Sequence, residues 1–517
     1  MIIKCKSYFY CCFYLLLALA TTSCWSTNSL QEEPTSEISF LSIREMIETA
    51  LVERNIPSVS VSVAHKGLII WEESFGWADR ENEIKASPDT VYSIASLTKP
   101  MTATAIMTLE NSGAVLLDSP IENFISPELL TFHEGSSQDV TIKQVLQHTS
   151  GLPQYFNYFY DDETDEVKAI EEVLQNFGTI VWSPGNEFVY SNLGYGLLGS
   201  VIETVSSKSL STYMKDDVFV PLDMKKTVFD PDSELGIAVK YDHDGNIIPF
   251  MRTDTPGSGS AYASVHDLIK FGMFHLNGEV DNQIQIIDNP TIKEMQQAPI
   301  GISYPDSVST RYGLGWFLGE TPEGVQVVMH EGGWTGASAM LKLIPSEDLA
   351  VAVTMNVFDS EFINLLTDEI LATALPDSDL IPGSIYPDST ESFVLQNGRY
   401  SGEITMSEQT VPISIEKSDD MGLYAFIGDS PSPDPVSLRI IPDFVPRLPG
   451  HFLASLPVSL NDENAQRRPH DIFLELKLTD NGMEGTATAR GQATPLRGNE
   501  RQYFLLPYHI TLDRNSN

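Results

Sequence analysis

Residues 91–103 read VYSIASLTKPMTA and place a serine and a lysine, Ser96 and Lys99, three positions apart. A proline such as Pro100 is tolerated in the first turn of a helix. The run MTATAIMTLEN that begins at Met101 has apolar residues at helical spacing. We therefore expect a helix that starts near Ser96 and carries Lys99 one turn further along the same face.

The same spacing also arises without any catalytic role. A serine at a helix start is a common N-cap, and the lysine that follows it then faces solvent. Ser414 and Lys417, in the segment ISIEK, repeat the spacing inside an alternating pattern that is typical of a strand. Spacing alone therefore does not identify a catalytic pair.

The composition describes an acidic globular protein. The 517 residues leave room for two or three domains, and 42% hydrophobic with 20% charged residues is typical of folded chains. The formal net charge of −40 repels nucleic acid and anionic bilayers, so nucleic acid is not expected as a partner. The sequence contains no evident metal-ligand cluster, P-loop or dinucleotide fingerprint, and we expect no cofactor and no metal.

The first 23 residues have the pattern of a signal peptide. A basic start at Lys4 and Lys6 precedes an almost wholly apolar run, residues 8–20. This run is shorter than a typical membrane-spanning helix. All 4 cysteines lie in this leader or at its edge, so the mature chain has at most one thiol. We expect residues 1–23 to be removed and residues 24–37 to form a polar tether.

Two cleavage patterns overlap at the end of the leader. TTSC at 21–24 resembles a bacterial lipoprotein cleavage box with Cys24 as the lipidated first residue, although Thr21 stands where that pattern prefers Leu. ALA at 18–20 fits an ordinary A-x-A site. Either site predicts export, to the periplasm or the membrane as a lipoprotein, or alternatively into the medium. Contact with a membrane is expected only through a lipid at Cys24.

Residues 38–375 predict one domain with strands at both ends and helices between them. A helical pattern covers residues 40–55, and two strand-like runs meet at Lys66-Gly67 as a hairpin. Strands alternate with turns from about residue 312, and EFINLLTDEILATAL (361–375) closes the region as a helix. We expect an α/β (α+β) fold, in which helices flank an antiparallel sheet built from both ends of the domain, next to a helical lobe.

The composition and the periodicity of the sequence change after this domain. Residues 376–390, PDSDLIPGSIYPDST, are rich in Pro, Asp and Ser and predict a linker. Residues 391–517 have little helical periodicity and many short alternating runs, which predicts a small all-β accessory domain, a barrel or a sandwich. We expect this domain to fold separately and to carry no catalytic group.

Acyl transfer by a serine and a lysine needs several further groups. The amine must be neutral to take the hydroxyl proton, a second polar group must pass a proton to the leaving group, and donors must hold the oxyanion. Segments that match such a set occur in order: YSIASLTKPMTA (92–103), LQHTSGLP (146–153), SPGNEFVYSNLGYGLLGSVIE (183–203), YGLGW (312–316) and HEGGWTGASAMLKLIP (330–345). Across about residues 37–375 the series resembles the class C β-lactamase and penicillin-binding-protein-like serine hydrolase family.

The resemblance implies a β-lactamase/transpeptidase-like fold and a role for each motif residue. Ser96 corresponds to the nucleophile of the family and Lys99 to the adjacent base. Tyr190 in YSN corresponds to the group that shares the proton transfers, and Asn192 to the residue that orients the substrate amide. The N–H of Ser96 and that of Gly333 would hold the oxyanion.

The third motif, from His330 to Gly332, reads H-E-G where true class C β-lactamases have K-T-G. We expect His330 to lie beside the substrate. Because an imidazole is charged only part of the time near neutral pH, it would bind a substrate carboxylate less firmly than a lysine. Within this family, the H-x-G motif is associated with peptidases and esterases more than with dedicated β-lactamases.

Other matches to the short motifs lack the surrounding pattern. Tyr155-Phe156-Asn157 also spells Y-x-N, but without the P-G-x-x-F-x-Y-S-N context, and H-x-G recurs at His65 and His133. His148 of HTSGLP is expected to be structural. Aromatic residues expected to pack beside the site are Tyr312, Trp316 and Trp334.

The sequence thus favours an exported serine hydrolase that cleaves an amide or ester bond of a small-molecule or peptide substrate through an acyl-enzyme at Ser96. The alternative is a dedicated β-lactamase or D-Ala-D-Ala carboxypeptidase, which the missing lysine of the third motif disfavours. A catalytically idle penicillin-binding-like sensor is disfavoured because Ser96, Lys99, Tyr190 and Asn192 are all intact.

Overall fold

The computed structural model describes most of the chain from residue 38 to residue 515. The segments left undescribed within that range are 133–135, 230, 232–236, 277–279, 303–310, 322–323, 377–394, 407–408, 420–421, 429–435, 441–450, 461, 463–464, 466–469, 480 and 493–501. The predicted signal peptide and tether, and all but the first residue of the predicted linker, lie outside the described residues.

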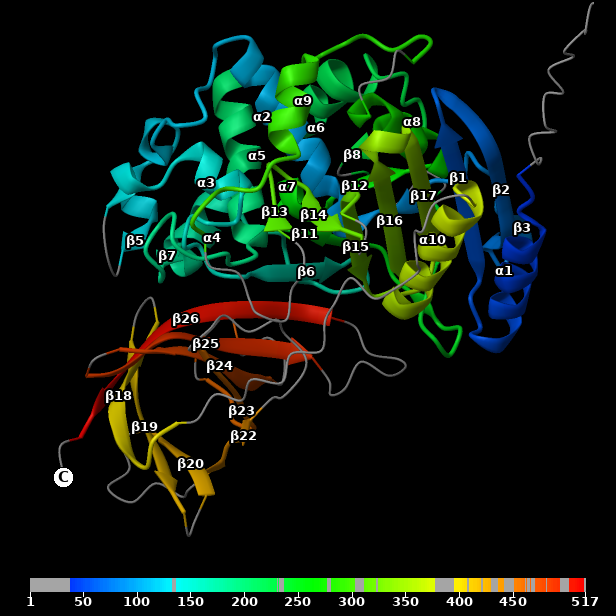
Figure 1. Ribbon diagram of the computed structural model, residues 1–517. Coiled ribbons are helices and arrows are strands. Elements are labelled where there is room, and N and C mark those ends of the chain that lie inside the picture. The colour runs from blue at the N-terminus through cyan, green and yellow to red at the C-terminus, as the bar shows by residue number, and fades with distance from the viewer. Residues whose placement is uncertain are drawn as a thin grey trace, which may run out of the picture. The chain divides into compact units, whose positions relative to one another are not determined.

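An eight-stranded antiparallel sheet forms the centre of the first region (Figure 1). β17, from the end of this region, pairs with β1, from its beginning, so that Val61 lies opposite Val353. The predicted sheet built from both ends of the domain is therefore confirmed. In sheet order the strands are β13 (Arg311–Tyr312), β14 (Phe317–Glu320), β15 (Gln326–Trp334), β16 (Ala337–Ile344), β17 (Leu349–Met355), β1 (Ser58–His65), β2 (Leu68–Asp79) and β3 (Ile84–Lys85).

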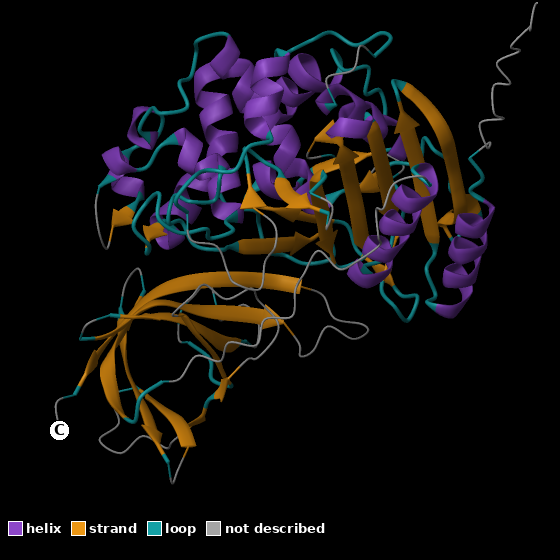
Figure 2. Ribbon diagram, viewed as in Figure 1, coloured by secondary structure: helices purple, strands orange, loops and turns teal. Residues whose placement is uncertain are grey.

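Most of the helices lie in the chain between β3 and β13, and helices pack against the sheet (Figure 2). The predicted first and last helices of the domain, α1 and α10, and the hairpin at Lys66-Gly67 are confirmed. The α-helices are α1 (Leu41–Glu53), α2 (Thr98–Asn111), α3 (Ile142–Leu146), α4 (Ile170–Phe177), α5 (Asn192–Ser206), α6 (Leu210–Tyr213), α7 (Pro256–Gly259), α8 (Val265–His275), α9 (Asn289–Met295) and α10 (Ser360–Ala374).

Both faces of the central strands are covered. β16 and β17 read ASAMLKLI and LAVAVTM, and every residue of both is buried, as expected of strands without a solvent face. Gly272 of α8 packs on Leu341 and Leu343 on one face. Lys342, between them, points to the other face and pairs with Asp368 of α10 at 2.6 Å.

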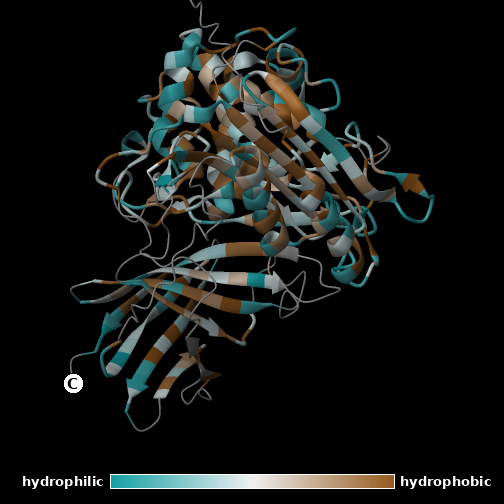
Figure 3. Cartoon of the chain, turned by 45° about the vertical axis from the view of Figure 1, so that its right-hand side comes forward, coloured by the Kyte–Doolittle hydropathy of each residue, from teal (hydrophilic) through white to brown (hydrophobic). Residues whose placement is uncertain are grey.

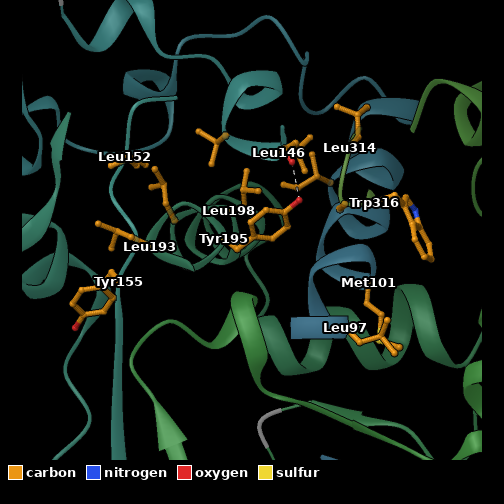
Figure 4. Close-up of a cluster of buried hydrophobic side chains, with 14 of the residues drawn as sticks. Leu97, Met101, Leu146, Leu152, Tyr155, Leu193, Tyr195, Leu198, Leu314 and Trp316 are labelled. Atoms are coloured by element: carbon orange, nitrogen blue, oxygen red, sulfur yellow. Dashed lines mark hydrogen bonds between the residues drawn. The ribbon is translucent and has the colours of Figure 1, made fainter. Parts of the chain in front are cut away.

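α2 and α5 meet in an apolar core that is continuous with the core of the central sheet (Figure 4). Leu97 and Met101 enter this core from the segment that carries Ser96, and Leu198 enters from α5. Tyr195 of α5 donates a hydrogen bond to the carbonyl O of Leu146 at 2.8 Å. Burial of these side chains fixes the start of α2 and the start of α5 relative to each other.

Short strands hold the segments around the start of α2. Ala263 pairs with Tyr92, which ties the segment after α7 to the segment before Ser96. The sheet that does this consists of β4 (Tyr92–Ser93), β12 (Ala261–Ala263) and β8 (Val228–Phe229). The other short strands of this region are β6 (Phe156–Tyr160), β11 (Met251–Thr253), β9 (Lys240–Tyr241), β10 (Ile247–Ile248), β5 (Thr131–Phe132) and β7 (Thr179–Ile180).

After residue 395 the helices and strands that the structure describes are all antiparallel strands, as predicted. The two outermost strands in the pairing order, β21 and β22, are separated by Leu438 alone, so the sheet curves back on itself. Hydrophobic and hydrophilic residues alternate along several of these strands (Figure 3). The strands are β18 (Gly398–Thr405), β19 (Thr410–Ser418), β20 (Gly422–Ile427), β21 (Val436–Ser437), β22 (Arg439–Ile440), β23 (His451–Leu456), β24 (Asp471–Leu478), β25 (Gly482–Gln492) and β26 (Gln502–Arg514). Because β26 also pairs with β6, independent folding of residues 391–517 stays a prediction.

Candidate active site

Ser96 lies in a 3₁₀ turn, η1 (Ala95–Leu97), that leads directly into α2. Ala95 has a φ of +44°, a left-handed conformation that costs a non-glycine residue on the order of 1–3 kcal/mol. The turn is held by its neighbours, since the N–H of Ile94 donates to the carbonyl O of Ala261 at 3.2 Å. The predicted helix start is confirmed, and strained backbone next to a serine is common at functional positions.

The Lys99 side chain is fully buried and points at Ser96. Its Nζ donates to Ser96 Oγ at 3.0 Å and to the carbonyl O of Ser258 at 2.9 Å. The ring centroids of Tyr190 and Tyr195 lie 4.7 and 5.7 Å from Nζ. Burial lowers the pKa of Lys99 well below its usual value, because the charged form loses its hydration. The amine is therefore suited to accept a proton from the serine.

Tyr190 and Asn192 flank the start of α5. Ser191 caps this helix, since its Oγ accepts a hydrogen bond from the N–H of Gly194 at 2.9 Å. Tyr190 is hydrogen-bonded to Ser96, and burial raises the pKa of its hydroxyl despite that bond. Asn192 is buried in the first turn of the helix. A protonated phenol at this point can relay a proton to and from Ser96.

His148 supports the segment that carries Tyr190. Its backbone is left-handed, with a φ of +58°, and its ring centroid lies 4.4 Å from that of Tyr190. Nδ1 accepts a hydrogen bond from the N–H of Ser191 at 3.0 Å, so the neutral ring carries its proton on Nε2. Burial, with Lys99 and His330 nearby, lowers the pKa of His148 well below its usual value. The structural role expected for His148 thus includes the placement of Tyr190.

His330 occupies the position of the third motif, but its ring nitrogens are both engaged. Nε2 is 3.0 Å from the hydroxyl of Tyr312, and Nδ1 is 2.6 Å from the carbonyl O of Glu331. Because a carbonyl only accepts, Nδ1 carries the proton and Nε2 accepts from Tyr312. Burial, reinforced by Lys99, lowers the pKa of His330 to about 3. The lowered pKa and the two engaged ring nitrogens argue against the expected partly charged imidazole, whereas a position of His330 beside the substrate stays a prediction.

We expect the imidazole of His330 to stay neutral between about pH 5 and pH 8. Below about pH 6.5 the unfolded chain binds a proton that the folded ring does not, so this group destabilises the fold as the pH falls. NMR of protein labelled with ¹⁵N-histidine measures the tautomer, and His330→Asn assigns its signal. A His330 signal that titrates near the ordinary histidine pKa would contradict the expectation.

β15 presents an open edge next to Ser96. β14 pairs with β15 only as far as Met329, whereas β16 pairs with it as far as Trp334. Among the described residues, the edge of β15 that begins at His330 therefore has no strand partner on the β14 side. Backbone N–H and C=O groups on such an edge can bind an extended substrate segment.

Two glycines lie on this edge, and one of them lets it approach the nucleophile. A Cβ on Gly332 would lie 1.9 Å from the carbonyl O of Ile94, and a Cβ on Gly333 would lie 2.5 Å from the ring of Phe358. Because the contact of Gly332 is with the backbone two residues before Ser96, β15 runs directly against the turn that carries Ser96. This proximity is what the oxyanion role expected of Gly333 requires.

The alternative motif matches take part in other contacts. Ser414 and Lys417 lie on the strand β19, as their alternating pattern predicted. Tyr155 and Asn157 both donate to Oδ2 of Asp254, at 2.7 and 3.0 Å. His65 ends β1 at the hairpin, and His133 lies outside the described residues.

Two contributors to the site are not evident from the sequence. The carbonyl O of Ser258 binds Lys99, and Tyr195 places its ring beside the same amine. A backbone carbonyl leaves no mark on residue identity, and the one available signal was the small-residue run PGSGS (256–260), which allows close packing. Trp316 and Trp334 are buried, as expected.

No group of three potential metal ligands occurs among the described residues. In the same part of the chain, no helix combines the length and the apolar character needed to cross a membrane.

Residues 43–374 of this chain match the family model described as Beta-lactamase. "Protein flp" of Staphylococcus aureus (strain MW2) is 28% identical over 335 residues, which cover 63% of this chain and 65% of that protein. "Penicillin-binding protein 4*" of Bacillus subtilis (strain 168) is 27% identical over 323 residues, which cover 58% of this chain and 68% of that protein. The chain thus spans 65% of the length of its staphylococcal relative.

Among solved structures, the octameric penicillin-binding protein homologue from Pyrococcus abyssi superposes with a TM-score of 0.56 at 22% identity. The match covers 90% of this chain and 99% of that one, so it extends over the C-terminal strands. The likeness shows the fold, and the predicted β-lactamase/transpeptidase-like architecture is confirmed.

Proposed function

Because the chain belongs to the beta-lactamase family, we propose that it is a serine hydrolase that cleaves an amide or ester bond through an acyl-enzyme on Ser96. One observation carries the proposal. The buried amine of Lys99 lies 3.0 Å from Ser96 Oγ, and burial lowers its pKa. A neutral amine within hydrogen-bond reach of a hydroxyl is the arrangement that activates a serine nucleophile.

The proposed reaction has two halves. Lys99 accepts the proton as Ser96 Oγ attacks the substrate carbonyl carbon, and the N–H groups of Ser96 and Gly333 stabilise the oxyanion. The leaving group departs with a proton that Tyr190 relays from Lys99. Water then attacks the acyl-enzyme by the reverse path and releases the acid and free Ser96. Asn192 orients the substrate amide.

The substrate class favoured is an ester or peptide amide rather than a β-lactam. His330, at the position of the third motif, is neutral and bonded to Tyr312, so it offers no charge to the β-lactam carboxylate. The experiment that tests this proposal also tests three alternatives: a dedicated β-lactamase, a D-Ala-D-Ala carboxypeptidase and an idle sensor. We also propose export with a signal peptide at residues 1–23 and a lipid anchor at Cys24, supported by the leader pattern.

Mass spectrometry of the intact protein tests the proposal. Wild-type protein and Ser96→Ala are each exposed to a fluorophosphonate, a penicillin and a D-Ala-D-Ala peptide. We expect the fluorophosphonate to add one adduct to the wild type and none to Ser96→Ala. Stable labelling by penicillin alone would favour the penicillin-binding sensor, and the absence of every Ser96-dependent adduct would contradict the proposal.

A further inference from the structure

Lys240, on β9, is a buried cation that the catalytic mechanism does not use. Its side chain is 5% exposed, and Nζ has no hydrogen-bond partner among the described residues. The ring centroids of Trp334 and Phe250 lie 5.8 and 5.9 Å from Nζ. A buried ammonium with neither a hydrogen bond nor an ion pair is costly, so it points to a partner that is not part of the protein.

A second buried donor belongs to the Trp334 ring over which Lys240 Nζ lies. The indole Nε1 of Trp334 is also buried and without a hydrogen-bond partner in the described part of the chain. Lys and Trp side chains have hydrogen-bond donors and no acceptor. A group that satisfies both Lys240 and Trp334 must therefore be an acceptor, and an anionic acceptor satisfies the ammonium best.

These donors are connected to the nucleophile through Trp334. A Cβ on Gly259 would lie 3.2 Å from Cζ3 of Trp334 and 3.9 Å from the backbone carbon of Ala95, the residue before Ser96. Cζ3 belongs to the benzene ring of the indole, on the side opposite Nε1. The indole thus packs beside Ala95 with one edge and carries its free N–H on the other.

Tyr158 continues the same surface. Ala95, Tyr158 and Trp334 belong to one buried apolar cluster, and the Tyr158 ring meets the Trp334 ring edge-on at 5.4 Å. Apolar contacts thus run from Ala95, the residue before Ser96, to the Trp334 ring over which Lys240 Nζ lies.

The ammonium of Lys240 has no ion-pair partner among the described residues. Asp161 is the charged group that acts on it, and Asp161 is already paired with Arg252 at 2.6 Å. Burial lowers the pKa of Lys240 to about 7, and the carboxylate of Asp161 opposes that shift. The charged form is therefore present at and below neutral pH, and a bound anion would stabilise it further.

We propose that Lys240 and Trp334 form an anion site that selects acyl donors with a carboxylate at the far end of the acyl chain. The inference rests on the proposed Ser96 acyl-enzyme and names its substrate class. It also assigns to Lys240 the charge that the neutral His330 does not supply. Lys240 is then a specificity-determining residue with no part in the proton transfers.

Two esters of equal chain length test this assignment: p-nitrophenyl hexanoate, which is neutral, and mono-p-nitrophenyl adipate, which ends in a carboxylate. We expect Lys240→Met to lower the adipate-to-hexanoate ratio of kcat/KM at least about tenfold, with hexanoate turnover within about threefold of wild type. Lys240→Arg should keep most of the ratio. The control Lys225→Met removes an exposed charge and should leave the ratio unchanged.

The wild type gives a second measurement that needs no folded variant. Its adipate-to-hexanoate ratio should fall as the pH rises from about 6 to about 9, because Lys240 loses its charge while adipate stays ionised. Changes in Lys99 affect both esters equally and cancel in the ratio. A ratio that is independent of pH and of Lys240→Met, with hexanoate still hydrolysed, overturns the anion site alone. If the wild type hydrolyses hexanoate no faster than Ser96→Ala, the proposed function fails instead.

Discussion

Ser96→Ala is expected to abolish hydrolysis of p-nitrophenyl acetate while the protein stays folded. The hydroxyl is the atom that forms the acyl bond, and no neighbouring side chain replaces it 3.0 Å from Lys99 Nζ. Loss of a nucleophile of this kind costs about 10³-fold or more in kcat. Steady-state kinetics measures the rate, and circular dichroism with thermal melting verifies the fold.

The chain offers a matched control for this substitution. Ser414→Ala removes a serine with the same Ser-x-x-Lys spacing, but on the strand β19, and should leave the rate unchanged. A loss for Ser96→Ala of less than about tenfold, which corresponds to about 1.4 kcal/mol of barrier, would contradict the assignment of the nucleophile.

Lys99→Met is expected to lower kcat/KM by about 100-fold or more, because a methionine of similar length fills the space but cannot take the proton from Ser96. The wild-type pH profile should carry the signature of the same group. Burial lowers the pKa of Lys99, so the amine is neutral and active above that pKa, and activity falls as the pH drops through it. Lys417→Met is the matched control and should retain wild-type rates.

The rate loss and the pH profile together distinguish a general base from a lysine that has only a structural role. If Lys99 served only to hold Ser258 through its carbonyl, Lys99→Met would lower the melting temperature and leave the pH profile of the residual activity unchanged. Retention of more than about a tenth of the wild-type kcat/KM in a folded Lys99→Met protein would contradict the role of general base.

Much of the site could be predicted because its parts are local in sequence. The turn before Pro100 sets Ser96 and Lys99 one helical turn apart, and the Ser191 cap sets Tyr190 and Asn192 at the start of α5. Caps, turns and helical spacing depend on neighbours within a few residues, so they can be predicted from the sequence. The motif order then identified which of the repeated short patterns belonged together.

The electrostatic state of the site could not be predicted in the same way. His330 stands at the expected position, but its charge depends on burial and on the hydroxyl of Tyr312, which reaches it from β13. The acceptor for Lys99 is a backbone carbonyl, that of Ser258, from a segment 159 positions away in the chain. Neither contact has a sequence signature of its own.

The sequence by itself determined the class of this protein: a leader pattern, an antiparallel sheet closed by both ends of one region, an all-β C-terminal part, and the positions of Ser96, Lys99 and Tyr190. Only the tertiary structure decided that the imidazole of His330 is neutral and that Lys240 stands unpaired beside Trp334. The physical reason is that the charge of a buried group depends on the loss of its hydration and on partners brought from distant segments, and both arise only when the chain is folded.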